Sequence, residues 1–256
     1  MLLRKSVFPL LLALLLTLGA VPAARADDTP EPLPVSGDFL VRIDGGYAEK
    51  HMETVGEQEC LRVDLFLDGV TNERLLSSIS MVLCYDADVL TYEKHKSLSG
   101  NGLMSTLNPN EPGLIRYAFI SSSGTLLNRN TPLLTLWFTL SDGLAEETQI
   151  RFAIAQGARA DSVDPGSGSY QTERRTVGAK LHPFGLGVLY GDANCDGRVT
   201  AADASLVLRA IVGVQALSDR GMKNAKVDGA EALSVQDAAL ILRAVVWLIE
   251  RFPVEA

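Results

Sequence analysis

Residues 191–212 read GDANCDGRVTAADASLVLRAIV and join a polar loop to the start of an amphipathic helix. Oxygen-bearing side chains stand at alternate positions of the loop, and a glycine follows the third of them. Oxygens in this pattern converge on one point, which suits a hard cation that takes six to eight oxygen ligands. The stretch therefore predicts a twelve-residue calcium loop that ends inside a helix.

The ligands follow from this register. Gly197 permits the sharp turn, Val199 would pin the loop to a hydrophobic core, and Thr200 could hold a water molecule. The closing residue is Asp, where a common EF-hand has the longer Glu. We expect one calcium ion to be bound by the side chains of Asp192, Asn194, Asp196 and Asp203 and the backbone carbonyl of Arg198. The alternative is that this loop is an ordinary Asp- and Asn-rich turn before a helix.

The helix recurs 34 residues later. Helices are expected over residues 203–214 and 237–250, each opened by an Asp at the N-cap. The two segments share Asp, Ala, Leu, Leu, Arg and Ala at matching positions, which indicates an internal duplication.

The second loop, residues 226–237, reads KVDGAEALSVQD and is degenerate. Lys226 replaces the first ligand, and only Asp228 and Asp237 remain as plausible ligands, so a second calcium site is doubtful. One hypothesis is that the Lys226 ammonium fills the vacated site by pairing with both carboxylates. The other is a decayed loop held by helix packing alone.

Upstream of the helices, the hydrophobic period is two. The alternation predicts strands over 60–67, 79–85, 115–119, 134–140 and 150–154. Gly- and Pro-rich turn signals separate them, among them Asn108-Pro-Asn-Glu-Pro-Gly, and no segment of helical period intervenes. We expect a mainly β, antiparallel two-sheet sandwich of the jelly-roll kind, followed by a small all-α domain. The expected domains are a signal peptide over 1–26, a Pro-rich spacer over 27–36, the sandwich over 37–183, a linker over 184–189 and the helical domain over 190–256.

The N-terminal segment has the features of an export signal. Arg4 and Lys5 precede the apolar residues 7–20, and Ala24-Arg25-Ala26 matches a cleavage site; an uncleaved anchor is the alternative. Without this segment the chain has 20 basic and 31 acidic residues, and its net charge changes from −8 to −11. We expect a secreted protein with no further membrane span. The acidic balance argues against nucleic acid as a partner.

The stretch YGDANCDGRVTAADASLVLRAIV and the second Asp-capped helix resemble the dockerin module of cellulosomes, of a type I-like kind, over residue 189 to the C-terminus. The resemblance implies paired calcium-loop-helix repeats that bind a cohesin module of a scaffoldin. The resemblance implies partner contacts at Ala201, Ala202 and Arg209 in the first copy and at Val235, Gln236 and Arg243 in the second. For Arg209 and Arg243 the alternative is that each is a solvent-exposed charge on its helix without a partner role.

The sandwich segment resembles a cohesin module. LSSISMVLCYDADVLTYE, GLIRYAFISSSG and PLLTLWFTL have the order and character of cohesin strands, although YDADVLTY is also similar to a motif of carbohydrate-binding modules. Such a sandwich binds a dockerin-bearing enzyme or a polysaccharide, or spaces other modules. Alternation places Trp137 beside Thr135 and Thr139 on the face opposite the core, as a protein anchor, a sugar platform or a covered side chain. A lone Trp favours protein binding.

Catalysis has no support in the sequence. His51, His95 and His182 lie in no recognisable catalytic or metal motif. For Cys60 and Cys84, a disulfide between them and two free thiols are the alternatives. We expect a non-catalytic adaptor of a cellulosome-like complex. The first alternative is a dockerin-borne carbohydrate-binding module that targets enzymes to plant cell wall. A small dockerin-bearing hydrolase is the second.

Overall fold

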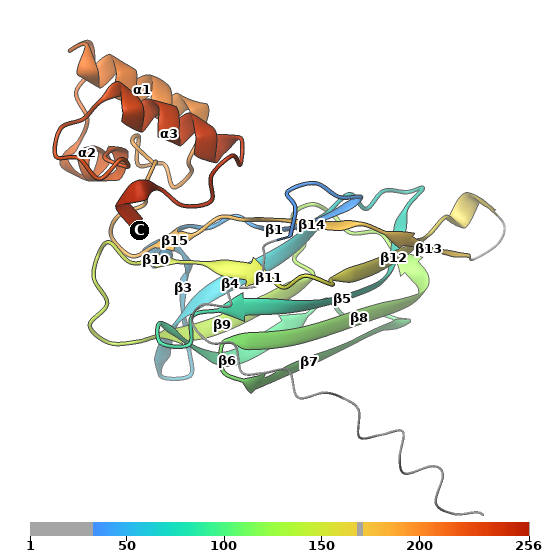
Figure 1. The fold of residues 1–256 in the computed structure, drawn as a ribbon. Helices are drawn as coiled ribbons and strands as arrows, with labels where there is room; N and C mark the ends of the chain where they lie inside the picture. The colour runs from blue at the N-terminus through green and yellow to red at the C-terminus, as the bar shows by residue number, and fades with distance from the viewer. Residues whose placement is uncertain (1–32, 168–170, 256) are drawn as a thin grey trace, which may run out of the picture. The chain divides into compact units, whose positions relative to one another are not determined.

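A computed structural model describes residues 33–167 and 171–255. The expected signal peptide and most of the Pro-rich spacer lie outside the described residues. The described chain forms a β-sandwich followed by a helical module, and both belong to one compact unit (Figure 1). None of the helices described is long and apolar enough to cross a bilayer.

The first sheet has the strand order β14-β1-β4-β9-β6, with β3 paired to β4. β1 and β14 run parallel, so the expectation of a purely antiparallel sandwich is wrong at this pair. These strands are β1 (Phe39–Ile43), β3 (Met52–Val55), β4 (Gln58–Asp68), β6 (Leu90–Ser97), β9 (Leu134–Leu140) and β14 (Val177–Leu181).

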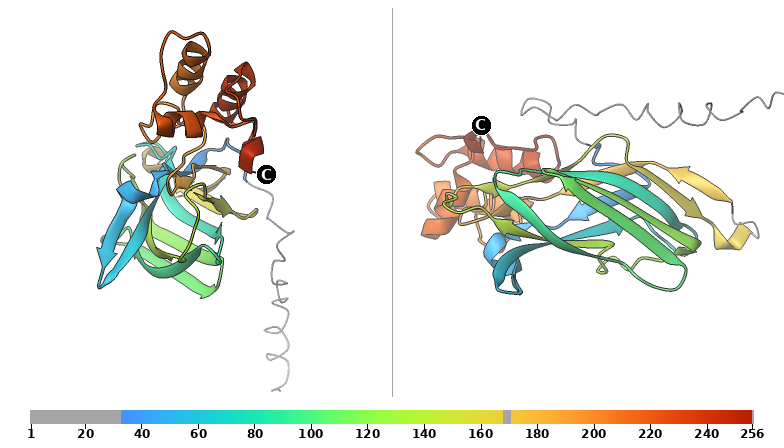
Figure 2. Two further views of the ribbon diagram at one scale, coloured as in Figure 1. Left: turned by 90° about the vertical axis from the view of Figure 1, so that its left-hand side faces the viewer. Right: turned by 90° about the horizontal axis from the view of Figure 1, so that it is seen from below.

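The second sheet has the order β13-β12-β5-β8-β7, with β11 paired to β5, and Figure 2 shows the sandwich from two further sides. Its strands are β5 (Leu75–Tyr85), β7 (Leu103–Glu111), β8 (Leu114–Thr125), β11 (Phe152–Ile154), β12 (Arg159–Val163) and β13 (Thr172–Arg175). A small third sheet joins β10 (Gln149–Ile150), β15 (Phe184–Gly185) and β2 (Gly46–Tyr47). Short 3-10 turns are η1 (Ala48–His51), η2 (Pro165–Ser167) and η3 (Pro253–Glu255).

Period-two alternation locates the core of the sandwich correctly. On β4 the side chains of Leu61, Val63 and Leu65 are buried, and the residues between them are half-buried. Four of the five predicted strands are present as single strands, whereas the one expected over 150–154 is divided at Arg151 into β10 and β11, which pair in different sheets. The turn expected from Asn108 onward falls later, at 112–113, because β7 continues through Pro109 as the last strand of its sheet. A proline is tolerated in such an edge strand.

The helical module contains α1 (Ala201–Ile211), α2 (Asp219–Ala225) and α3 (Val235–Val245). The N-caps of α1 and α3 are Thr200 and Ser234, not the predicted aspartates. Asp203 and Asp237 are the third helical residues and complete capping boxes. Val207 of α1 and its counterpart Ile241 of α3 are fully buried in a core separate from that of the sandwich.

The expected linker over 184–189 is largely part of the folded structure. Phe184 lies in β15 and in the sandwich core, and Val188 and Leu189 are buried. β15 pairs with both β10 and β2, so backbone hydrogen bonds fix this segment. The chain therefore enters the first loop without a free spacer.

Candidate functional site

The first loop encloses two fully buried carboxylates, those of Asp192 and Asp203. The oxygens of Asp192 accept the backbone N–H groups of Asp196 (3.2 Å) and Gly197 (2.8 Å). Burial raises the pKa of Asp192, and the carboxylates of Asp203 and Asp196 add to that rise. The loop thus places negative charge where solvent does not reach it.

The remaining side chains of the loop lie around these two. Asp203 accepts the backbone N–H groups of Asn194 (3.0 Å) and Thr200 (2.8 Å). The Asn194 amide donates to Asp196 Oδ2 (3.1 Å), and Asp196 Oδ1 accepts the N–H of Arg198 (2.9 Å). The structure therefore brings together the four side chains that the sequence predicted as ligands. Val199 packs against the core of the helical module, as expected.

The donor set suits a hard cation. No Lys or Arg of the described residues forms an ion pair with Asp192, Asp196 or Asp203. Buried carboxylates without a cation are costly, and each still has lone pairs beyond those used by N–H groups. Within the described ranges, no three His, Cys, Asp or Glu side chains form a group that could hold a metal ion by themselves. The Asn194 amide and the Arg198 carbonyl would have to complete the oxygen set.

The second loop is held by hydrogen bonds of its own. Asp237 is fully buried and accepts the N–H groups of Val227 (2.8 Å), Asp228 (3.0 Å) and Ser234 (2.8 Å). In the part of the chain that the structure describes, Lys226 forms no ion pair with Asp228 or Asp237. The hypothesis of a Lys226 ion pair is therefore wrong, because backbone donors take the place of the ammonium.

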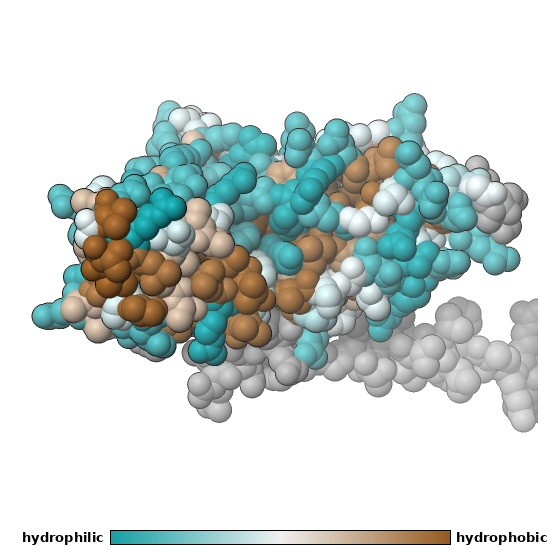
Figure 3. Space-filling view, turned by 90° about the horizontal axis from the view of Figure 1, so that it is seen from above, coloured by the Kyte–Doolittle hydropathy of each residue, from teal (hydrophilic) through white to brown (hydrophobic). Residues whose placement is uncertain are grey.

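All six predicted partner contacts of the two helices are exposed. They are Ala201, Ala202, Arg209, Val235, Gln236 and Arg243. Neither arginine forms an ion pair among the described side chains. Apolar side chains gather over the helices, at the left of the view in Figure 3. The exposed apolar residues of α1, α3 and the segments after them are Leu208, Ile211, Val212, Val214, Val235, Leu242, Val246 and Leu248.

Trp137 does face away from the core, but it is not a free platform. Its side chain is only 9% exposed, and its Nε1 donates to Glu53 on β3 (2.8 Å). Lys94 of β6 lies over the ring, with Nζ 4.6 Å from the centroid. Arg62 also pairs with Glu53 (2.8 Å), and the bonds from Arg62 and Trp137 lower the pKa of Glu53. The interpretation of Trp137 as an exposed anchor is therefore corrected: neighbouring strands cover it.

The covered position of Trp137 gives a testable result. We expect Trp137→Phe to lower the free energy of unfolding by about 1 kcal/mol, because one hydrogen bond to a carboxylate is lost. Denaturant titration measures this change. Retention on insoluble cell-wall polysaccharide should equal that of the parent chain. Weaker retention at unchanged stability would restore a sugar-binding role for this residue.

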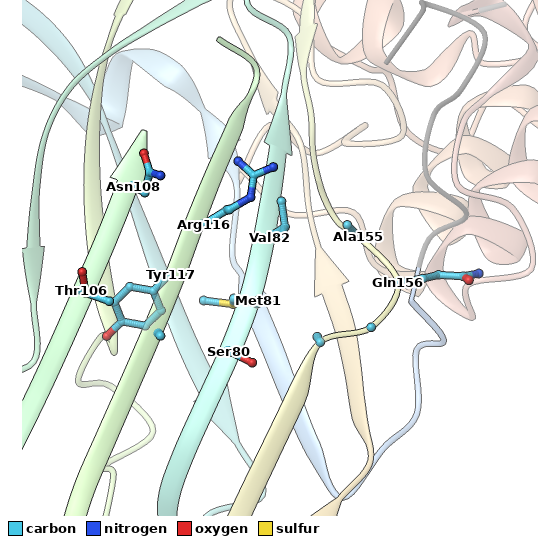
Figure 4. A pocket seen from close by; sticks show the side chains of 12 residues that line it. Ser80, Met81, Val82, Thr106, Asn108, Arg116, Tyr117, Ala155 and Gln156 are labelled. Carbon is cyan, nitrogen blue, oxygen red and sulfur yellow. The ribbon is translucent and has the colours of Figure 1, made fainter. Parts of the chain in front are cut away.

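A different face of the sandwich offers exposed apolar side chains. Met104 on β7 and Ile120 on β8 are cross-strand neighbours, 69% and 52% exposed. A hollow of about 320 Å³ lies beside these two residues (Figure 4). Residues of β5, β7 and β8 and of the segment after β11 line it. Arg116 and Asn108 are among the side chains that line it. Sequence reasoning missed this face, although the inward Tyr117 and Phe119 already implied that Ile120 points outward.

The three cysteines are free thiols. Cys60 lies on β4 and Cys84 on β5, which belong to different sheets. A Cys60–Cys84 disulfide is therefore not formed.

No protein-family model matches the chain, and no curated protein matches it. Among solved structures, the chain is similar to the sixth cohesin of scaffoldin B from Acetivibrio cellulolyticus, solved with a Cel5 dockerin mutant. The identity is 17%, 58% of this chain and 98% of that chain are covered, and the TM-score is 0.44. The seventh ScaB type I cohesin from Pseudobacteroides cellulosolvens gives 15% identity, 58% and 91% coverage and a TM-score of 0.43. A non-cellulosomal cohesin from the archaeon Archaeoglobus fulgidus gives 14% identity, 58% and 90% coverage and a TM-score of 0.40. The chain is thus similar in structure to cohesin modules.

Proposed function

We propose that this chain is a secreted, non-catalytic adaptor of a cellulosome-like complex, with one binding face on its helical module and another on its sandwich. One observation carries the proposal. Asp192 lies in the loop before α1 and Asp203 in its first turn; both are buried, and neither forms an ion pair with a described Lys or Arg, while α1 and α3 present exposed apolar side chains. A calcium-dependent protein-binding module accounts for both features at once.

Calcium would act on the fold of the helical module. Bound in the first loop, the ion supplies positive charge to the buried carboxylates, so that metal binding and the ordering of the loop are coupled. Asp203 belongs to both the loop and the capping box of α1. The position of α1, and with it the partner face, therefore depends on the filled loop. The second loop carries no such role, since Lys226 stands at the first ligand position and only Asp228 and Asp237 remain as ligands.

The helical face has the chemistry of a protein interface. Exposed apolar side chains that cluster, rather than scatter, mark an interaction surface. Arginines are enriched at binding hot spots, and Arg209 and Arg243 stand exposed on the two helices. The fitting partner has an apolar surface with carboxylates. Together with the dockerin-like sequence motif, this favours a cohesin module of a scaffoldin.

The sandwich would bind its partner through the sheet that contains Met104 and Ile120. Its cohesin-like sequence favours a dockerin-bearing enzyme as that partner. The polysaccharide alternative depended on an exposed aromatic platform, and Trp137 is covered by Glu53 and Lys94. Polysaccharide targeting therefore has no candidate residue left on this strand.

Binding of the full mature chain to a panel of purified scaffoldin cohesin modules tests the proposal. We expect at least one module to bind in calcium and none in EDTA. The variant Arg209→Glu/Arg243→Glu should weaken that binding roughly 100-fold, as expected for two hot-spot side chains at more than 1 kcal/mol each. Surface plasmon resonance measures both effects.

The matched control is Arg129→Glu, an exposed arginine of the sandwich. It changes the net charge in the same direction and should leave the affinity for the cohesin unchanged. Equal binding by the double variant, or a panel without any binder, would contradict the proposed role.

A further inference from the structure

We propose that the first loop is a calcium site shared between the two parts of the chain, in which the Tyr47 hydroxyl on the sandwich side positions Asp192 through the Asn224 amide. This inference rests on the proposed calcium binding and deepens it. It makes Tyr47 a positioning residue that lies almost 150 positions away from the loop in sequence.

A buried polar cluster connects Tyr47 to the loop. Asn224 of α2 is fully buried, and its Nδ2 donates to the Tyr47 hydroxyl (2.8 Å) and to the backbone carbonyl of Asp192 (2.7 Å). Its Oδ1 accepts the N–H of Leu189 (3.0 Å), and its carbonyl accepts that of Gly191 (2.8 Å). One amide thus joins the sandwich, the segment entering the loop and the loop itself.

The Tyr47 hydroxyl reaches Asp192 through the Asn224 amide. The Nδ2 of Asn224 donates both to the phenol oxygen and to the Asp192 carbonyl, so the position of the hydroxyl and that of the loop backbone depend on each other. A hydroxyl that fixes the Asn224 amide therefore also fixes the backbone of Asp192, and with it the position from which the Asp192 side chain enters the loop.

The Tyr47 ring is fixed from its other sides. The guanidinium of Arg220 stacks over it, 3.9 Å from the centroid, and also donates through Nε to the carbonyl of Gly187 (2.9 Å). Arg220 pairs in addition with Glu49 (3.3 Å). A cation–π contact of this kind holds the ring in one orientation. The hydroxyl therefore has little freedom to turn away from the loop.

The backbone of the sandwich also approaches the loop closely. A Cβ added to Gly46 would lie 3.1 Å from the carbonyl of Gly197, the turn glycine. Gly46 has φ 119°, a conformation that side chains rarely adopt. The strand β2 therefore packs directly on the sharp turn of the loop. The close approach to Gly197, together with the Asn224 bridge to Asp192, makes the sandwich part of the site.

This arrangement has a quantitative consequence. Groups that orient a metal ligand without touching the metal typically change metal affinity 10–100-fold. By reciprocity, calcium bound in the loop strengthens the contact between helical module and sandwich by the same factor. The helical module alone would then bind calcium more weakly than the full chain does.

Calcium titration of the full chain by calorimetry tests the inference. We expect Tyr47→Phe, which deletes only the hydroxyl, to weaken calcium binding at least tenfold. The control is Tyr92→Phe, which deletes the hydroxyl that bonds His95 Nδ1 (2.7 Å) on β6 and should leave the affinity unchanged. Circular dichroism of both variants reports whether the fold is kept.

A second variant keeps the test sharp if Tyr47→Phe folds poorly. Arg220→Ala leaves every atom of the loop in place and removes the stack on the ring; it should weaken calcium binding about threefold or more, as a cation–π contact implies. Parent-like affinity in folded Tyr47→Phe and Arg220→Ala would overturn the inference while leaving calcium binding intact. A parent chain that takes up no calcium would overturn the proposed function itself.

Discussion

Asp192→Asn is expected to weaken calcium binding by roughly 100-fold or more. Removing a group that only orients a metal ligand typically weakens binding by about 10–100-fold, and Asp192 would be a ligand itself. The substitution keeps the size of the side chain and one of the two oxygens, which separately accept the N–H groups of Asp196 (Oδ1) and Gly197 (Oδ2). It removes the charge that the cation would neutralise. Calorimetric titration of the full chain measures the change, together with the number of ions bound.

The duplication provides the matched control. Asp228→Asn makes the same exchange in the second loop, where Asp228 bonds the N–H of Ala230 (2.8 Å) and the hydroxyl of Ser234 (3.2 Å). Calcium affinity should not change, and the parent chain should bind one ion. Two ions per chain, or equal losses in both variants, would show that the second loop is a working site.

Phe138→Ala is expected to lower the free energy of unfolding of the sandwich by about 3–5 kcal/mol, the usual result of emptying a buried aromatic site. Phe138 is fully buried on β9, and its ring centroid lies 5.0 Å from that of Tyr85 and 5.6 Å from that of Phe152. The melting temperature should fall by roughly 10 °C. Calorimetric scans of the calcium-loaded chain measure it.

Calcium affinity provides a second readout for this variant. The sandwich and the helical module have separate hydrophobic cores, so a cavity in the first should leave the affinity of the folded chain unchanged. Ile120→Ala, at an exposed position on the other sheet, should change stability by no more than about 0.5 kcal/mol. A Phe138→Ala protein as stable as that control would contradict the placement of the core.

Local patterns in the sequence were enough to predict the loop and the main strands. The spacing of Asp192, Asn194, Asp196 and Asp203 brought these side chains together as expected, and alternation identified the buried face of β4. The N-caps were misplaced because Asp is favourable both at the cap and at the third position of a capping box. The hydrophobic period of a helix does not show whether such an Asp stands at the N-cap or at the third helical position.

Contacts between distant segments were beyond the reach of such patterns. The face of Trp137 was predicted, but its cover comes from Glu53 and Lys94, on strands with no local sign of that contact. Tyr47 lies in a two-residue strand, too short to produce any periodic signal. The parallel pairing of β1 and β14 joins segments more than 130 residues apart, and such partners are chosen by the whole sheet.

The pairing of β15 with β10 and β2 also sets how an adaptor of this kind would select what it joins. A flexible tether lets two captured proteins search a volume and meet in many poses, at an effective concentration set by chain statistics. Here the path from sandwich to loop is hydrogen-bonded and buried, so that search volume is nearly absent. Two bulky partners would bind together only when their shapes do not collide. Steric compatibility, as well as affinity, would decide which pairs this chain assembles.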